Sequence, residues 1–322
     1  MKYIAYFSVL MILGILSFIY LKIADKFNII DKPNHRSSHT TPTIRGGGIL
    51  FFLAILIFFI ISEFKYPYFV LGVSLIAVIS FIDDIITLSP AIRLPFQFLA
   101  VGLCFFESGI IPNSGFLILP VLLIGGVGLV NEYNFMDGIN GITGFYSIVS
   151  VLGLLMINYQ ENLVDSSLLS YVLISIIVFG FYNFRKKARM FAGDIGSITI
   201  AVLICFIGSL FIYKLKSPVL LLLVSVYSGD AILTVFYRKL NGEKLTEPHR
   251  KHIYQKLVHT LKIPHLKVSM FYAFLQLSIN IIVFYSYRLN FSTQLLILSL
   301  ISLILIITYI YIFKLIAKKE VN

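Results

Sequence analysis

Residues 191–213 read FAGDIGSITIAVLICFIGSLFIY, and Asp194 is the only charged residue among them. The part after Asp194 is close to the ~20 residues that an α-helix needs to cross a bilayer. Its apolar residues are continuous rather than alternating, which argues against a membrane strand. The stretch therefore predicts a transmembrane helix that begins directly after a short polar segment.

Apolar stretches of this kind recur from end to end of the 322-residue chain, which is 58% hydrophobic and 13% charged. Soluble domains rarely have this composition. We therefore predict an all-α, polytopic integral membrane protein that forms a single domain over residues 1–322, with about eleven helices. The expected helices are 3–21, 46–62, 67–82, 95–110, 115–131, 141–158, 166–182, 195–213, 217–235, 268–287 and 293–314. The first is expected to be a retained helix, because its basic end is Lys2 alone and no small-residue cleavage site follows Tyr20.

The basic residues are distributed unevenly between the two sides that these helices define. Of the 26 Lys and Arg residues, 21 belong to one side, and the positive-inside rule makes that side cytoplasmic. An odd number of helices then puts the N-terminus outside and the C-terminus in the cytoplasm. The net charge of +11 lies mainly in short links, which fits anionic lipid and substrate phosphate better than nucleic acid. The cytoplasmic links with chemical interest are 22–45, 83–94, 132–140, 183–194 and 236–267.

Two of these links carry aspartates next to helix ends. Asp83 and Asp84 end an expected helix, where a negative charge opposes the helix dipole, so a site is favoured over a hydrated helix end. As neighbours they point about 100° apart and need not share one ligand. Asp194 lies directly before the expected helix 195–213, in the sequence AGDIGS. It could be a helix cap, or it could hold phosphate or a phosphate-bound cation.

Amides gather in the stretch from Asn131 to Gly144. Asn131, Asn134 and Asp137 are spaced i, i+3, i+6, which predicts one face of a helix, and Asn140 follows among glycines. The alternative is a polar turn built from residues that favour turns. So many polar groups between two apolar stretches favour a binding site.

Two basic links complete the set. The sequence EPHRKHIYQ, at 247–255, places His249 and His252 three residues apart. The link has no cysteine and no HExxH pattern, so contact with a diphosphate is favoured over zinc binding. The alternative is a solvated basic loop. DKPNHRSSHTTPTIRGGG, at 31–48, lacks the GKS or GKT of an ATP-binding P-loop. Its three glycines fit either helix packing or ligand approach. Asp230 lies eight residues before Arg238, which is about 12 Å along the expected helix 217–235, and an acid at that depth needs a partner or water.

Together, in order and on one side, these elements resemble the polyprenyl-phosphate N-acetylhexosamine-1-phosphate transferases, glycosyltransferase family 4. The form is closer to the O-antigen and teichoic-acid initiating branch than to the peptidoglycan branch. The resemblance implies transfer of N-acetylhexosamine-1-phosphate, with GlcNAc-1-phosphate the expected group, from a UDP-sugar to undecaprenyl phosphate at the cytoplasmic face of the plasma (inner) membrane. UMP leaves, and the lipid-linked product starts a cell-surface polysaccharide such as lipopolysaccharide O-antigen or a cell-wall polymer. The resemblance also implies that Mg²⁺ is required, with Mn²⁺ as a substitute, and it is compatible with a homodimer.

The resemblance also assigns residues. It makes Asp83, Asp84, Asp137 and Asp194 catalytic, with Asp194 and Asp84 at the metal. It places at the substrates Arg36, His39, Arg45, Arg93, Asn131, Asn134, Asn140, Asn183, His249 and His252. The chain departs from the pattern in two ways: HRKH stands where the peptidoglycan branch has three adjacent histidines, and Arg93 is the nearest base after the aspartate pair. A secondary transporter and a non-catalytic lipid-linked-sugar binding protein remain as alternatives. The gathering of polar groups at one face, without a repeat, disfavours the transporter.

Overall fold

The computed structural model describes residues 2–33, 38–113, 115, 117–244 and 249–321, and it is helical apart from one short pair of strands. The long elements are α1 (Lys2–Lys26), α2 (Ile49–Ile61), α3 (Pro67–Ile85), α4 (Pro90–Glu107), α6 (Leu119–Phe135), α7 (Ile142–Glu161), α8 (Ser166–Asn183), α9 (Gly193–Leu215), α10 (Ser225–Leu240), α12 (His265–Ser286) and α13 (Phe291–Val321). The short ones are α5 (Ile110–Asn113), the 3₁₀ helix η1 (Pro218–Val224), α11 (Ile253–His259), β1 (Ile30–Asp31) and β2 (Thr43–Ile44).

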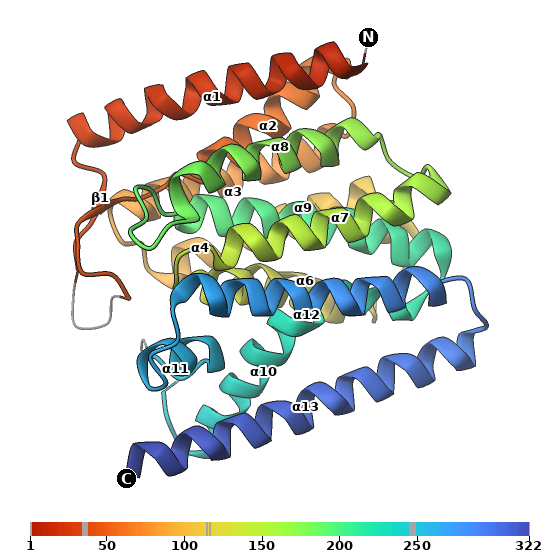
Figure 1. The fold of residues 1–322 in the computed structure, drawn as a ribbon. Helices are drawn as coiled ribbons and strands as arrows, with labels where there is room; N and C mark the ends of the chain where they lie inside the picture. Colours follow the sequence, from red (N-terminus) through yellow and green to blue (C-terminus); the bar gives the residue numbers. More distant parts are fainter. Residues whose placement is uncertain (1, 34–37, 114, 116, 245–248, 322) are drawn as a thin grey trace.

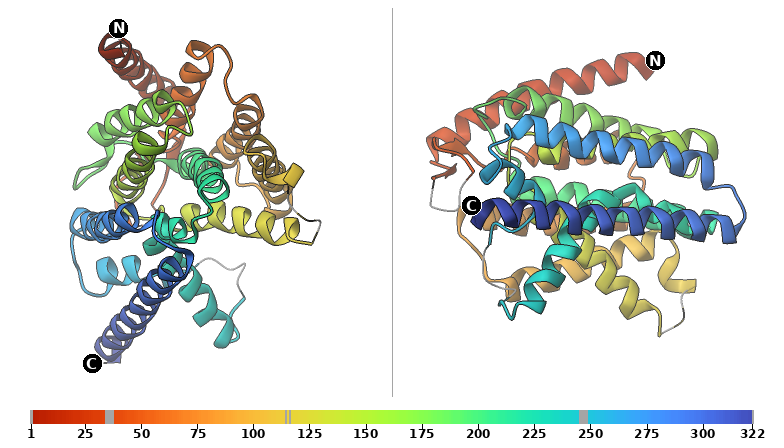
Figure 2. Two further views of the ribbon diagram at one scale, coloured as in Figure 1. Left: turned by 90° about the vertical axis from the view of Figure 1, so that its right-hand side faces the viewer. Right: turned by 60° about the horizontal axis from the view of Figure 1, so that its bottom comes forward.

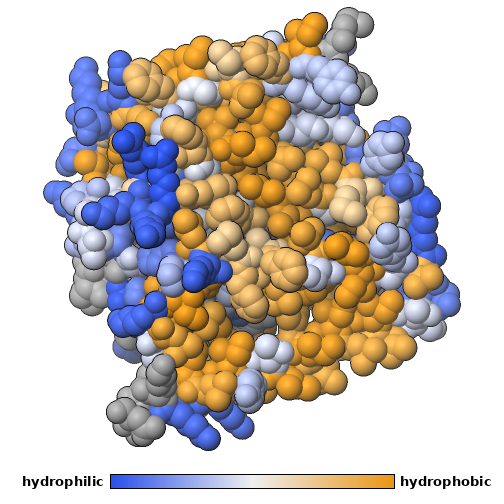
Figure 3. All heavy atoms as spheres, in the orientation of Figure 1, coloured by the Kyte–Doolittle hydropathy of each residue, from blue (hydrophilic) through white to orange (hydrophobic). Residues whose placement is uncertain are grey.

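The helices lie mostly side by side, and the N-terminus and C-terminus lie at opposite ends of the bundle (Figure 1). A broad hydrophobic surface separates two hydrophilic margins (Figure 3). Over the described residues, nine helical segments are long and apolar enough to cross a membrane, with η1 and α10 counted together, and α2 and α6 are shorter apolar helices. Each of the eleven predicted segments therefore has a helical counterpart, and the protein is a multi-pass membrane protein.

Helix α9, which contains most of the sequence quoted first, is the centre of the bundle (Figure 2). In its most apolar window 83% of the residues are buried, against 6% for α13 at the periphery. A helix that is hydrophobic all round is expected in such a central position. Since Asp194 is in the first turn of α9, the fold holds this carboxylate at the middle of one end of the bundle.

The segment that follows β2 runs along the polar stretch before α9. β1 and β2 pair antiparallel, and Ile44 forms an isolated parallel bridge with Met190. The backbone N–H groups of Gly47 and Gly48 then donate to the carbonyls of Phe191 and Ala192, both at 2.8 Å. This contact brings two links far apart in sequence to one place. It also resolves the role of the glycines, which serve close backbone packing here.

Replacing Gly48 by Ala should destabilise the protein strongly. A Cβ at this position would lie 2.0 Å from Gly196 Cα, and a backbone atom cannot move aside as a flexible side chain can. We expect a loss of about 3 kcal/mol, near the upper end of overpacking costs. Thermal unfolding in detergent measures it, with Gly14→Ala as the control, because a Cβ at Gly14 would meet nothing within 4 Å. Equal melting temperatures for the two variants would contradict the packing.

The expected single helix 217–235 is interrupted, which is a difference from the prediction. The chain passes from η1 into α10, which runs obliquely to its neighbours (Figure 1). Gln276 on α12 donates to Leu222 O at 2.8 Å and accepts from Val226 N–H at 3.1 Å. Tyr146 Oη accepts from Tyr227 N–H at 3.2 Å. Backbone groups inside a membrane need internal partners, so these two side chains make the interruption tolerable.

Candidate active site

The aspartates at the ends of α3 and α9 meet across the first turn of α9. The carboxylate of Asp84 accepts from the backbone N–H groups of Asp194 at 2.8 Å and Ile195 at 3.2 Å. Arg45 joins both acids: its Nε lies 2.7 Å from Asp84 Oδ1, and its guanidinium donates to Asp194 Oδ1 at 3.0 Å. The Asp84 side chain is fully buried, whereas that of Asp194 remains 14% exposed. Asp84 therefore fixes the start of α9, and Asp194 is the more accessible acid.

Arg93, on α4, makes a second bridge of the same kind. One of its nitrogens donates to Asp83 Oδ2 at 2.8 Å and to Asp194 Oδ2 at 3.1 Å. Asp83 also accepts from the backbone N–H of Leu88 at 2.5 Å. As expected for adjacent helical positions, Asp83 and Asp84 face different partners. With all three carboxylates ionised, the two guanidinium groups leave one negative charge in this cluster, which a further cation would neutralise.

A pocket of about 270 Å³ opens beside this cluster. It is lined by Asp31, Ser38, His39, Arg45, Asn134, Asp137, Gly138, Ile139, Asn140, Asn183, Phe191, Gly193, Asp194 and Gln255. Seven of the predicted site residues, drawn from three separate links, are therefore gathered at one cavity. Its polar character, with acids and one arginine among the lining groups, suits a ligand that carries phosphate together with hydrogen-bonding groups.

Asp137 lies beyond the end of α6, so the expected helical face formed with Asn131 and Asn134 is not present. The helix ends at Phe135, and the chain turns there. Asp137 Oδ1 accepts from the hydroxyl of Thr143 at 2.5 Å. Burial raises the pKa of this carboxyl to about 6, and the Asp194 charge acts in the same direction. Asp137 is therefore mostly ionised at pH 7 at a cost to the fold.

Replacing Asp137 by Asn should leave the fold as stable as wild type, or more stable, at pH 7.5. A carboxyl whose pKa rises from 3.8 to about 6 on folding destabilises the folded state above pH 6 and not below 3.8. The free energy of unfolding should rise by at most roughly 3 kcal/mol, and by less than this limit because Asp137 is partly exposed. Melting temperatures at pH 7.5 and pH 5 measure it, and the difference should shrink at pH 5. A lower melting temperature than wild type at pH 7.5 would mean that the charge stabilises the fold.

The four asparagines divide between the pocket and the bundle. Asn134, whose Nδ2 donates to Ser197 Oγ at 3.3 Å, lines the pocket. Asn140 and Asn183 line it too, but their amides also tie loops together: Asn140 Nδ2 donates to Arg185 O at 3.0 Å, and Asn183 Oδ1 accepts from Gly141 N–H at 2.7 Å. Asn131 instead forms a reciprocal amide pair with Gln97 at 2.8 and 3.3 Å and is not among the pocket residues.

The two histidines of the 236–267 link have unequal positions. His252 is buried, and its Nδ1 lies 3.3 Å from Asp230 Oδ1. Asp230 also accepts from the backbone N–H groups of Ile253 at 2.9 Å and Tyr254 at 3.2 Å, so it caps α11. His249 is half-buried, and burial together with the nearby His252 lowers its pKa to about 4. At pH 7 a neutral His249 can offer a hydrogen bond to an anion but no charge.

A family model described as glycosyl transferase family 4 matches residues 66–212, which include Asp83, Asp84, Asn134, Asp137 and Asp194. Over these 147 of its 322 residues, the chain matches glycosyl transferase family 4.

Curated relatives agree with this match. The chain is 26% identical over 278 residues to a probable undecaprenyl-phosphate N-acetylglucosaminyl 1-phosphate transferase of Bacillus subtilis (strain 168), covering 79% of this chain and 76% of the relative. It is 26% identical to an undecaprenyl-phosphate alpha-N-acetylglucosaminyl 1-phosphate transferase of Yersinia pestis, covering 75% and 72%. It is 25% identical to a phospho-N-acetylmuramoyl-pentapeptide-transferase of Streptococcus equi subsp. equi (strain 4047), covering 68% and 74%.

Sequence reasoning missed several residues of the pocket beside Asp194. Phe191, whose ring lies 4.8 Å from that of His39, carries no signal because it is one of 29 phenylalanines. Asp31, Ser38 and Gln255 lie within the stretches that were singled out but had no assigned role. These three residues could have been identified by their location in the same polar links as the predicted site residues. Arg36, predicted to contact substrate, lies outside the described residues.

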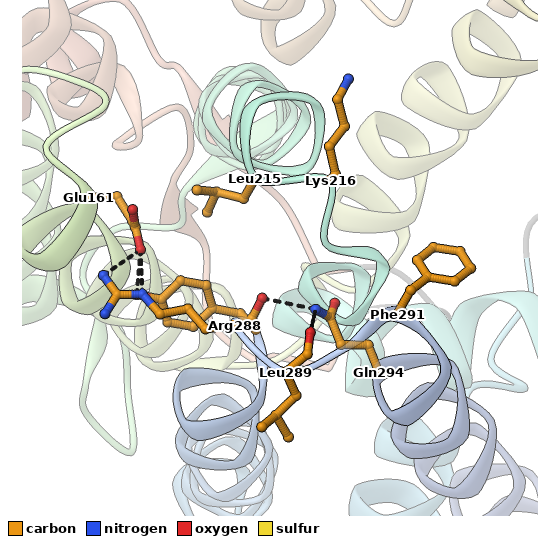
Figure 4. Close-up of a pocket in the computed structure, with 8 residues that line it drawn as sticks. Glu161, Leu215, Lys216, Arg288, Leu289, Phe291 and Gln294 are labelled. Atoms are coloured by element: carbon orange, nitrogen blue, oxygen red, sulfur yellow. Dashed lines mark hydrogen bonds and ion pairs between the residues drawn. The ribbon is translucent and has the colours of Figure 1, made fainter.

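A second pocket, of about 330 Å³, lies at the other end of the bundle between the ends of α7 and α9 and the α12–α13 link (Figure 4). Glu161 there accepts from Arg288 Nε at 2.8 Å. Gln294 donates to the carbonyls of Tyr287 at 3.0 Å and Leu289 at 2.7 Å. Its polar groups are largely paired with one another, and Glu161 is the only acid among its lining residues. The carboxylate cluster therefore identifies the pocket beside Asp194 as the candidate active site.

The donor set of that pocket fits a magnesium ion held partly by substrate. No group of three or more His, Cys, Asp or Glu side chains is arranged for metal binding among the described residues. Mg²⁺ characteristically uses one or two carboxylates together with water and substrate phosphates. Asp194 and Asp137 both line the pocket, whereas the oxygens of Asp84 are engaged by N–H donors. The residues present thus favour Asp194 with Asp137, and the predicted role of Asp84 at the metal stays a prediction.

Proposed function

We propose that this protein transfers N-acetylhexosamine-1-phosphate, with GlcNAc-1-phosphate the expected group, from a UDP-sugar to undecaprenyl phosphate, and that residues 1–322 form one domain for this reaction. The observation that carries the proposal is the junction of the Asp83–Asp84–Asp194 cluster with a polar pocket at one end of the membrane bundle. A water-soluble nucleotide-sugar and a membrane-bound phosphate can meet only at such a boundary. The names of the Bacillus subtilis and Yersinia pestis relatives describe the same chemistry.

The reaction joins two anions, so the protein must neutralise charge and align the reactants, as in other phosphoryl transfers. A lipid phosphate oxygen attacks the phosphorus attached to the sugar. A new P–O bond forms, the bond from that phosphorus to the bridging oxygen breaks, and UMP leaves with this oxygen and its electron pair. A phosphate monoester has a second pKa near 6, so the acceptor is largely ionised at pH 7 and a general base would contribute little.

Within this scheme Arg45 and Arg93 hold the aspartates and can exchange carboxylate for phosphate oxygens. Asp194 and Asp137 would hold Mg²⁺, with Mn²⁺ as a substitute, and the bound ion would offset charge on the diphosphate. Asp83 or Asp84 would take a residual proton from the acceptor. We prefer direct attack over an aspartyl-phosphate intermediate, because Asp83 and Asp84 are both engaged by donors.

The cellular setting follows from the same assignment. By the positive-inside rule, the basic links favour a pocket at the cytoplasmic face of the plasma membrane, with the N-terminus outside. The lipid diphosphate sugar produced there would start a cell-surface polysaccharide. Nucleic acid is not a partner in this scheme, and a homodimer is compatible with it.

UMP release by purified protein tests the proposed function. The assay contains Mg²⁺, undecaprenyl phosphate and, in turn, UDP-GlcNAc, UDP-GalNAc and UDP-glucose. We expect release that requires both the lipid and the divalent ion and that is fastest with an N-acetylhexosamine. Folded protein that binds UDP-sugars but releases no UMP with any of them would favour the non-catalytic reading.

A further inference from the structure

One buried polar atom at the pocket lacks a partner. Gln255, on α11, lines the pocket, and its Oε1 is buried without a hydrogen-bond partner among the described residues. Buried side-chain oxygens are nearly always paired with protein or water, and an unpaired one is costly. This atom therefore calls for a donor that the described residues do not supply.

The neighbouring tyrosine fixes which way the Gln255 amide points. The hydroxyl of Tyr254 donates its proton to Phe135 O at 3.0 Å. Burial raises the pKa of Tyr254, and a hydrogen bond between the Gln255 side chain and this hydroxyl opposes that rise. A hydroxyl has only one proton, so Gln255 must be the donor there, through Nε2. Its Oε1 is left as a pure acceptor.

Gln255 is held in a rigid frame. Asp230 caps α11 through the N–H groups of Ile253 and Tyr254, and Tyr254 is completely buried. Tyr254 packs so closely on the loop after α6 that a Cβ at Gly138 would lie 2.2 Å from its hydroxyl oxygen. The orientation of the amide is thus built into the fold, as a residue that selects a ligand requires.

We propose that Gln255 Oε1 accepts a hydrogen bond from an N–H of the nucleotide-sugar and so determines donor specificity. The inference rests on the proposed function, because a UDP-N-acetylhexosamine carries two such groups, the imide N–H of uracil and the acetamide N–H of the sugar. The pocket carboxylates of Asp31, Asp137 and Asp194 cannot donate, and they serve as acceptors for hydroxyl groups or as metal ligands. Sites that hydrogen-bond a substrate N–H discriminate strongly against analogues without it.

Calorimetric titration of the detergent-solubilised protein with UMP, UDP-GlcNAc and UDP-glucose tests the inference. Gln255→Met removes the acceptor at similar volume, and Gln160→Met, at an exposed glutamine, is the control. We expect Gln255→Met to bind UDP-GlcNAc about 10-fold more weakly. An equal loss for UMP assigns the bond to uracil, and a loss confined to UDP-GlcNAc assigns it to the acetamide.

Two results would overturn the inference. The first is unchanged affinity for all three ligands in a Gln255→Met variant that melts like wild type. The second is an equal loss of affinity for UDP-GlcNAc and UDP-glucose without a loss for UMP, which would indicate that a sugar hydroxyl is the partner. If the variant does not fold, wild-type protein decides the question. The inference then requires that N3-methyl-UMP bind at least 10-fold more weakly than UMP, or that UDP-glucose bind at least 10-fold more weakly than UDP-GlcNAc. Equal affinities in both pairs would reject the inference. Failure of the wild-type protein to bind any UDP-sugar would instead count against the proposed function.

Discussion

Asp194→Asn should reduce the rate of UMP release by about 1000-fold or more while the protein still folds. Asp194 is the acid that both arginines share, and it is the member of the cluster that lines the pocket. The amide keeps one oxygen for Arg45 or Arg93 but removes the charge that would hold a cation. Single-turnover rates with saturating Mg²⁺ and UDP-GlcNAc measure the effect.

The matched control for this substitution is Asp165→Asn. Asp165 caps α8 through Ser167 N–H at 3.0 Å and pairs with Lys65, away from the pocket residues. Its replacement should cost less than about 1 kcal/mol of stability, because asparagine caps a helix as well as aspartate does and the pair with Lys65 is largely exposed, and it should leave the rate unchanged. Asp194→Asn protein that retained more than a tenth of the wild-type rate would exclude a central role for this carboxylate.

Arg45→Met should produce the largest loss of stability among the site variants. Arg45 neutralises Asp84, whose side chain is fully buried, and also Asp194. Breaking a buried pair by removing one partner costs about 3–5 kcal/mol, because an uncompensated charge remains. Thermal unfolding in EDTA measures this loss. Because the cluster then carries one more net negative charge, Mg²⁺ should raise the melting temperature of the variant more than that of wild type.

Arg189→Met provides the comparison for Arg45. Arg189 is an exposed cation on the link between α8 and α9, at the same end of the bundle. Its removal should change the melting temperature little and in the same way with and without Mg²⁺. If Arg45→Met melted like Arg189→Met in EDTA, the ion pairs around Asp84 would not stabilise the fold as described.

The sequence permitted accurate prediction wherever a local pattern decides structure. Continuous apolar stretches predicted the helices, and adjacency predicted that Asp83 and Asp84 face different partners. Tertiary contacts decide the rest. The interruption before α10 depends on Gln276, which is 50 residues away from the backbone N–H that it pairs with at Val226. No pattern in 217–235 could reveal it.

The candidate site shows the same division. The acids and amides that line the pocket stood out because polar side chains are costly between transmembrane helices and so mark function. Asn131 stood out for the same reason, yet it pairs with Gln97 on a neighbouring helix. Gln255 received no role although it lies in a stretch singled out for its histidines, because only the fold shows that α11 turns it toward the pocket lining. Helix periodicity carried beyond Phe135 likewise misplaced Asp137.

The fate of the sugar-linked phosphorus tests the central claim most directly. Purified protein is incubated with undecaprenyl phosphate, Mg²⁺ and UDP-GlcNAc labelled with ³²P at the phosphorus next to the sugar, and lipid and aqueous products are separated. Phosphoryl transfer predicts that the label enters the lipid and that the released nucleotide is unlabelled UMP. Label recovered in UDP, with sugar alone on the lipid, would contradict the account, because the protein would then transfer the sugar without its phosphate.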